Sequence, residues 1–254
     1  LYGHADVVVV NNLSKMPHPI HLSNVADPLN YVGNLANLIK PEGKVVVRAP
    51  YLGEIVNKGL IDYVYHEHQS YFSLISITNL FSRLGFGIVS ARRCKDDDLN
   101  AQFVFSKNRP VVNEDLLEND FSRQEGSLDL GNTATYRLLG ERLKICRKRI
   151  RKELEDLSTA TIAGYGASVA SVSMMYQYKI VDFIDFLVDD NEEKVGLFSP
   201  NANLQVKRSN SLYLDNVGVL VLLASRFVDK IMERHRKFTG RVLIPHLGVE
   251  GFDA

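Results

Sequence analysis

The sequence has few cysteines, no net charge and no long apolar run. Two distant cysteines, Cys94 and Cys146, argue against a disulfide framework and indicate free thiols in a reducing compartment. Lys+Arg and Asp+Glu both number 30, so the broad basic surface typical of nucleic-acid-binding proteins is not expected. No apolar run approaches the ~20 residues of a membrane helix, and no signal segment opens the chain. We therefore expect a cytoplasmic protein without a nucleic-acid or membrane partner, whereas the oligomeric state stays open.

Apolar residues are plentiful. They make up 45% of the 254 residues, enough for one large domain or two ordinary ones. The run ADVVVVNN, residues 5–12, has the continuous apolar character of a buried parallel strand. A domain rarely opens on such a central strand, so we expect an N-terminal portion before Leu1.

Hydrophobic periodicity predicts two α/β halves. The first is expected to contain helices at 27–39, 51–61 and 73–86, a turn at 40–44, strands at 5–10 and 45–50, and an antiparallel pair at 87–94 and 101–107. The second is expected to contain strands at 159–163, 181–191, 217–224 and 240–246, with a helix at 226–238. The fold class is therefore α/β, with two Rossmann-like doubly wound domains, the first incomplete at its N-terminus.

A polar stretch joins the two halves. Residues 108–132 are predicted to be a connection, and 133–157 a long helix with a basic run from Arg147 to Lys152. We interpret that run as a solvated helix face in preference to a phosphate or nucleic-acid patch. The predicted domain boundaries are 1–110 for the first domain, 111–158 for the connection and long helix, and 159–254 for the second domain.

A glycine turn follows the strand at 159–163. Its residues are Gly164, Tyr165, Gly166, Ala167 and Ser168. Backbone N–H groups at the start of a helix attract phosphate, so a nucleotide-sugar contact is one interpretation. A tight turn without a ligand is another, and both stay open.

An acidic residue about 25 positions further on extends the first interpretation. Asp189 resembles the residue that accepts a ribose hydroxyl in dinucleotide folds. NAD binding is a weaker interpretation, because Val169 stands at the third glycine of GxGxxG.

The string YHEH, residues 65–68, carries the sharper chemical signal. An imidazole takes or gives a proton near neutral pH, Glu67 can orient a neighbouring histidine, and Tyr65 can donate to a developing oxyanion. Acid–base catalysis is the favoured interpretation. A metal site at His66 and His68 and a purely structural cluster are alternatives, and we expect no metal in this chain.

Several strings together resemble the S-adenosylmethionine (SAM)-dependent sugar C-methyltransferases, which act on nucleotide-linked keto-deoxysugars. They are ADVVVVNN, KPEGKVVVRAPYLGEIV, DYVYHEHQSYFSLISITNLFSRLGF, GYGASVASVSMMYQY, DFIDFLVDDNEEKVGLFSP and GRVLIPH. The resemblance is collinear over nearly the whole chain. It implies a SAM-binding domain and a second Rossmann-like domain, with the glycine-rich SAM loop and a zinc-binding domain upstream of Leu1. A piece starting there is expected to bind SAM poorly and to be inactive alone.

The resemblance also implies roles for individual residues. His68 would be the base that forms an enolate from the keto sugar, supported by Tyr65, His66 and Glu67. Asn11 and Asn12 would edge the SAM site. The turn at 164–168 would hold part of the nucleotide sugar, near its diphosphate.

Three departures from the family pattern favour a different class of function. Asn24 stands at the place of a family histidine, for which His18 and His21 are alternatives; Ala170 stands at the place of a lysine; and residues 96–102 replace a GGSLR string. A non-catalytic nucleotide-sugar-binding or assembly module is therefore the alternative to an enzyme, and the intact YHEH string argues against it.

Overall fold

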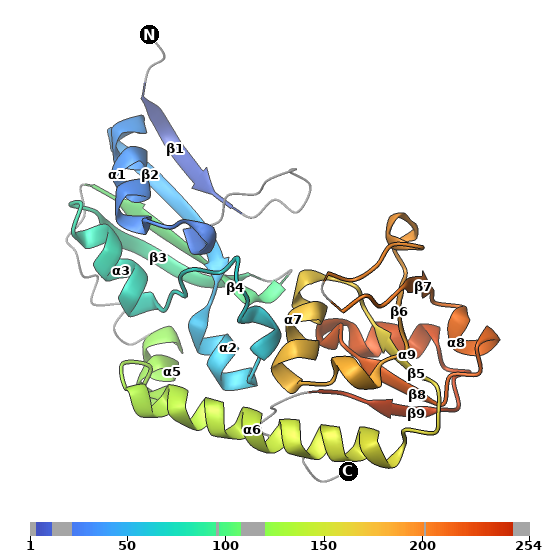
Figure 1. Cartoon of the computed structure of the whole chain (residues 1–254). Helices are drawn as coiled ribbons and strands as arrows, with labels where there is room; N and C mark the ends of the chain where they lie inside the picture. Colours follow the sequence, from blue (N-terminus) through green and yellow to red (C-terminus); the bar gives the residue numbers. More distant parts are fainter. Residues whose placement is uncertain (1–3, 12–21, 95–96, 108–119, 201, 246–254) are drawn as a thin grey trace. The chain divides into compact units, whose positions relative to one another are not determined.

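The computed structural model describes residues 4–11, 22–94, 97–107, 120–200 and 202–245. The chain forms two compact units (Figure 1). The first unit consists of Leu1–Asn57 and His66–Tyr136, and the second unit of Lys58–Tyr65 and Arg137–Ala254. The predicted α/β fold class is confirmed.

The first unit contains a mixed sheet with the strand order β1-β2-β4-β3. Its strands are β1 (Ala5–Val10), β2 (Ile39–Pro50), β3 (Gly87–Cys94) and β4 (Asp97–Ser106). The β1 and β2 strands run parallel, and β4 is antiparallel to both β2 and β3. The predicted antiparallel pair at the sheet edge is thus confirmed.

The α1 (Pro28–Leu38) and α3 (Leu74–Ser82) helices contact each other and the strands of this sheet (Figure 1). The other helical segments described in this unit are η1 (Leu22–Asn24), α2 (Leu52–Lys58) and α5 (Asp120–Leu128). Phe81 of α3 stacks on Phe105 of β4 with ring centroids 3.8 Å apart. Such aromatic burial fixes the helix on the sheet.

The first unit differs from the sequence prediction in three places. The expected turn at 40–44 lies within β2, where Ile39 pairs with Ala5. The β1 strand is not buried on both faces, because it lies at the edge of the sheet, and Val7 and Val9 are more than half exposed. The expected polar connection contains α5, whose buried contacts come from only a few residues.

The second unit contains a parallel five-stranded sheet with the order β7-β6-β5-β8-β9. The strands are β5 (Ile162–Tyr165), β6 (Phe186–Asp189), β7 (Val206–Arg208), β8 (Val219–Leu222) and β9 (Arg241–Leu243). The central β5 strand has neighbours added in both directions, which is the doubly wound arrangement. The β7 strand was not predicted.

Alternate residues of these strands belong to two separate cores. Ile162 and Val221 pack with residues of α6 (Thr133–Asp156) and α7 (Val169–Tyr178). Ala163 and Leu220 pack with residues of α8 (Ser211–Leu214) and α9 (Val228–Arg234). Short 3-10 helices complete the unit: η2 (Ile61–Tyr63), η3 (Val181–Phe183), η4 (Glu192–Lys194) and η5 (Ser225–Phe227). The continuous apolar strands therefore reflect burial on both faces.

The basic run of α6 has a structural role within the second unit. Arg147 Nε donates a hydrogen bond to the Gln177 carbonyl over 2.8 Å, and Arg151 donates to the Lys179 carbonyl. Both carbonyls lie at the C-terminal end of α7, where unsatisfied acceptors favour cations.

Two further features agree with the composition. The Cys94 and Cys146 side chains are buried, and neither forms a disulfide in the described part of the chain. Within the described ranges, no helix combines the length and apolar character that a bilayer crossing requires.

Candidate functional site

The YHEH string crosses the boundary between the two units. Tyr65 belongs to the second unit, and the other three residues to the first. His66 and Glu67 are exposed in a turn, and Tyr65 is half-buried. The His68 side chain is buried, with 8% of its surface exposed. Of the two histidines in this string, the buried one is therefore His68, which is predicted to be the base.

Backbone hydrogen bonds hold the segment after His68 at two places. The N–H groups of Gln69 and Ser70 both donate to the Ser23 carbonyl of η1, over 2.8 and 3.0 Å. Further along, the Phe72 carbonyl accepts a hydrogen bond from the Leu52 N–H over 2.9 Å. The His68 ring meets the Tyr71 ring edge-on at 6.0 Å. These contacts fix the backbone that carries the buried imidazole.

Four polar atoms of the first unit are buried without a hydrogen-bond partner among the described residues. They are Asn11 Oδ1, directly after β1, Ser23 Oγ and Asn24 Oδ1 of η1, and Thr78 Oγ1 of α3. Burying such atoms unpaired is costly, so each calls for a donor from a ligand or water. Asn12, His18 and His21 lie outside the described residues.

The predicted glycine turn begins later than expected, because Gly164 and Tyr165 lie in β5, but glycine is required at both Gly164 and Gly166. A Cβ at Gly164 would lie 2.7 Å from Leu187 Cδ2. Gly166 has a φ of +110°, and a Cβ there would lie 2.8 Å from Ser171 Oγ. Ser168 caps α7 by accepting a hydrogen bond from the Ser171 N–H. The turn is thus specified by close packing and by backbone conformation.

Asp189 and the glycine turn are brought together by a direct hydrogen bond. Its Oδ2 accepts from the Ala167 N–H over 2.8 Å and from Lys194 Nζ over 3.0 Å, and its Oδ1 accepts from the Asn191 N–H. Burial alone would raise the pKa of Asp189, but these donors outweigh it and hold the pKa below its ordinary value. The Gly166 N–H donates to the Val188 carbonyl. Two amides of the turn are therefore engaged inside the protein.

The Tyr165 side chain belongs to a hydrogen-bond network around the buried His235 ring. Its hydroxyl donates to Asp190 Oδ1 over 2.9 Å and lies 3.0 Å from His235 Nε2, while the Tyr213 hydroxyl lies 3.2 Å from His235 Nδ1. Burial lowers the pKa of His235, a nearby aspartate opposes that shift, and Arg234 adds to it. A neutral imidazole protonated at Nε2 satisfies every one of these contacts.

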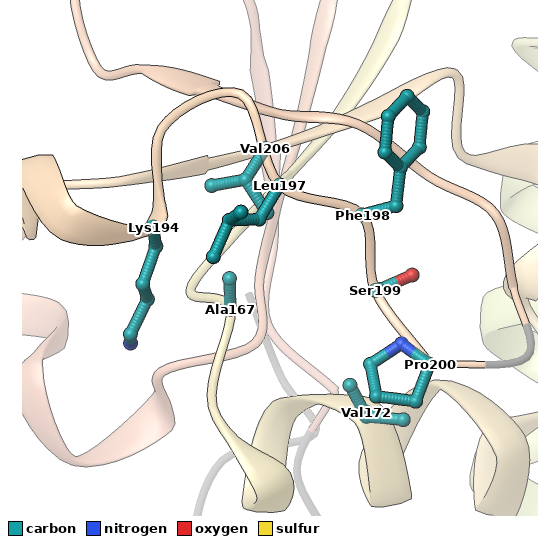
Figure 2. Close-up of a pocket in the computed structure, with 8 residues that line it drawn as sticks. All are labelled: Ala167, Val172, Lys194, Leu197, Phe198, Ser199, Pro200 and Val206. Atoms are coloured by element: carbon teal, nitrogen blue, oxygen red, sulfur yellow. The ribbon is translucent and has the colours of Figure 1, made fainter.

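A small cavity of about 90 Å³ lies beside the glycine turn (Figure 2). Its lining residues are Ala167, Val172, Lys194, Leu197, Phe198, Ser199, Pro200 and Val206. Figure 2 shows Pro200 next to Val172 of α7, and the Phe198 ring directed away from both. The cavity is therefore mostly apolar, with Lys194 as its cation.

Sequence reasoning missed two kinds of contributor to these sites. Ser23 acts through its backbone carbonyl, which no side-chain pattern reveals. Lys194 lies in a polar stretch where charged residues are unremarkable.

Metal ligation received no support from the geometry. Within the part of the chain that the structure describes, no group of three or more His, Cys, Asp or Glu side chains is placed to hold a metal ion. His66 and His68 differ in exposure, although they are only two positions apart.

Two comparisons with known proteins bear on identity. Residues 109–245 match the family model described as the C-methyltransferase C-terminal domain. The chain is also 27% identical over 238 residues to "C-methyltransferase NovU" of Streptomyces niveus, an alignment that covers 89% of this chain and 54% of that protein. The chain thus spans about half the length of this curated relative. Because the matched domain takes up more than half of the sequence, the chain belongs to the C-methyltransferase family.

Proposed function

We propose that this chain is part of a SAM-dependent C-methyltransferase that acts on a nucleotide-linked keto-deoxysugar. The observation that carries the proposal is a buried histidine, His68, on a loop anchored by its backbone in the first unit. Family membership supplies the reaction class. An imidazole held in place near neutral pH is suited to proton removal.

The first step is proton abstraction. A keto group acidifies the neighbouring C–H bond, and the His68 imidazole takes that proton while the electron pair forms an enolate. Tyr65 donates to the enolate oxygen, and His66 and Glu67 support the developing charges. The protonated imidazole then carries the proton until solvent removes it.

Methyl transfer completes the reaction. When bound, SAM would supply the chemistry of a sulfonium methyl donor to the enolate carbon, with a thioether as the leaving group. Asn11 and Asn12 would edge the cofactor site. The unpartnered Asn11 Oδ1 fits a donor such as an amine or ribose hydroxyl. Asn24 Oδ1 and Ser23 Oγ offer acceptors of the same kind.

The second unit would hold the nucleotide part of the substrate. Asp189 is a carboxylate with a lowered pKa, and so can accept a ribose hydroxyl at neutral pH. The segment from Gly164 to Ser168 would approach the diphosphate with its backbone. Lys194, rather than a lysine at the place of Ala170, would be the nearby cation.

The decisive experiment follows deuterium exchange. The full-length protein is incubated in D₂O with a nucleoside-diphosphate-linked 4-keto-6-deoxyhexose, and uptake at the carbons beside the keto group is followed by NMR. We expect His68→Ala to abolish exchange and methyl transfer while SAM affinity stays within a few-fold. His4→Ala, which removes an exposed histidine, is the matched control. Wild-type-like turnover of His68→Ala would remove His68 from the mechanism.

A non-catalytic nucleotide-sugar-binding module is the second candidate. It is favoured by Asn24, which stands at the place of a family histidine. This candidate predicts that the wild-type protein binds the sugar nucleotide but catalyses neither deuterium exchange nor methyl transfer.

A further inference from the structure

Glu125 is a buried carboxylate outside the residues assigned above. It lies on α5 with 2% of its surface exposed. Its Oε1 accepts hydrogen bonds from the Tyr51 hydroxyl over 2.9 Å and from the Leu74 N–H. Its Oε2 accepts from the Ile75 N–H over 3.3 Å. A carboxylate this deeply buried is costly unless its acceptors are used, and here three donors converge on it.

The Glu125 carboxylate completes the N-terminus of α3. The first turn of a helix leaves its backbone donors without intrahelical partners. Ser73 Oγ accepts from the Ser76 N–H, and the Ser73 carbonyl accepts from the Ile77 N–H. Glu125 takes the two remaining donors, those of Leu74 and Ile75. An anion is favoured at this position by the helix dipole.

The same carboxylate joins the two chain segments that bracket the end of the His68 loop. Tyr51 directly follows β2, and Leu74 opens α3 two residues after Phe72. Between them, Tyr51 and Phe72 form an isolated parallel bridge. The Glu125 carboxylate therefore anchors the end of the loop from His68 to Phe72, through its hydrogen bonds to Tyr51 and Leu74. The Ser23 carbonyl anchors the start of the same loop.

Other contacts dock α5 without touching α3. Phe121 meets the Tyr51 ring edge-on at 4.8 Å, and the Arg93 guanidinium lies 5.0 Å from the centre of the Phe121 ring. Arg93 bonds both Glu54 and Gln124. Glu54 is also buried and also contacts α5, through a hydrogen bond from Gln124. It is therefore the matched control for Glu125.

We propose that Glu125 is a positioning residue for His68, acting through the α3 N-terminus and Tyr51. This inference rests on the proposed function in that His68 is taken as the base. Its direct consequence is that loss of the carboxylate displaces the imidazole without removing it. A displacement of about 1 Å in a catalytic group reduces turnover by up to about a hundredfold.

The test compares Glu125→Gln with Glu54→Gln in the full-length protein. Histidine labelled with ¹⁵N reports the His68 ring by NMR without any substrate, and His68→Ala assigns its signals. We expect Glu125→Gln to shift the His68 ring signals and to lower kcat for deuterium exchange at least about tenfold, with KM within about twofold. The Glu54→Gln variant is compared at a similar loss of melting temperature. We expect it to leave both the His68 ring signals and kcat near their wild-type values.

A gentler variant covers the case in which Glu125→Gln does not fold. Tyr51→Phe removes only the hydroxyl donor and keeps the ring against Arg93 and Phe121, and it should give a smaller shift of the same His68 signals. The proposal is overturned if those signals are unchanged in both variants, or if Glu54→Gln moves them equally. The NMR measurement needs no turnover, so it tests the positioning role of Glu125 by itself. The proposed enzyme activity is tested separately, by whether His68→Ala loses deuterium exchange and methyl transfer.

Discussion

At the scale of single residues, Gly166 is a position where backbone conformation and close packing both require glycine. Its φ of +110° disfavours any residue with a Cβ, and the added atom would lie 2.8 Å from Ser171 Oγ and 3.0 Å from Ala224 Cβ. We expect Gly166→Ala to lower the free energy of unfolding by about 1–3 kcal/mol, as measured by urea denaturation.

Gly140 provides the matched control in the same unit. It lies within α6, and a Cβ there meets nothing within 4 Å. Gly140→Ala should therefore raise the free energy of unfolding by about 0.5–1 kcal/mol, because alanine is the better helix former. Equal effects of the two substitutions would show that the conformation of Gly166 is not needed.

Residue-level prediction began the turn two residues too early, because Gly164 and Tyr165 belong to β5, and it did not find the partners of the turn. The string GYGAS and the approximate distance to Asp189 were readable from the chain. That the Asp189 carboxylate would bind the Ala167 N–H was not, because both a ligand and an internal carboxylate suit the same amide. Similarly, YHEH does not reveal that His68 is buried while His66 is exposed. Burial depends on what the rest of the first unit packs against each ring.

At the scale of elements, long periodic segments were predicted well and short ones poorly. The α6 helix was expected at 133–157 and spans Thr133–Asp156. The three-residue β7 strand is too short to show a period, and it exists because β6 offers it a pairing edge. The α5 helix lies in a mostly polar stretch, and one of its two buried residues is the acid Glu125. Tertiary contacts decided both short elements.

The contact between α6 and the end of α7 gives a prediction at this scale. Arg147 and Arg151 lie one turn apart and supply donors to two terminal carbonyls of α7. Replacing both by leucine keeps helix propensity but removes those donors. We expect a loss of about 1–2 kcal/mol in the free energy of unfolding, measured with urea.

Lys148 is the control for that double variant. It is an exposed member of the same basic run, so Lys148→Leu should change stability by no more than about 0.5 kcal/mol. If Lys148→Leu proved as costly as the double substitution, the basic run would act through its general charge and not through these two hydrogen bonds.

At the scale of the whole molecule, the two units have separate hydrophobic cores. The first core includes Phe81, Phe103 and Phe105. The second unit has one core on each face of its sheet, and Ile61 from the Lys58–Tyr65 segment joins one of them. The family model begins at residue 109, whereas α5 packs in the first unit. A boundary drawn along the sequence therefore differs from one drawn by contacts, because the chain crosses between the units more than once.

The buried His235 network makes the stability of the second unit depend on pH. The folded pKa of His235 is lowered from its ordinary value of 6.5, chiefly by burial. Below pH 6.5 the unfolded chain binds a proton that the folded chain does not, so unfolding becomes easier as pH falls. We expect hydrogen exchange of the β5 and β8 amides to report a constant unfolding free energy above about pH 7, and a decline below it until the folded pKa is reached. In His235→Gln, which keeps a donor for Tyr165, stability should be lower throughout but its slope between pH 7 and 5.5 should flatten. The same slope in wild type and variant would assign the dependence to groups other than His235; Asp189 is not among them, because its lowered pKa acts only near pH 3.8 and below.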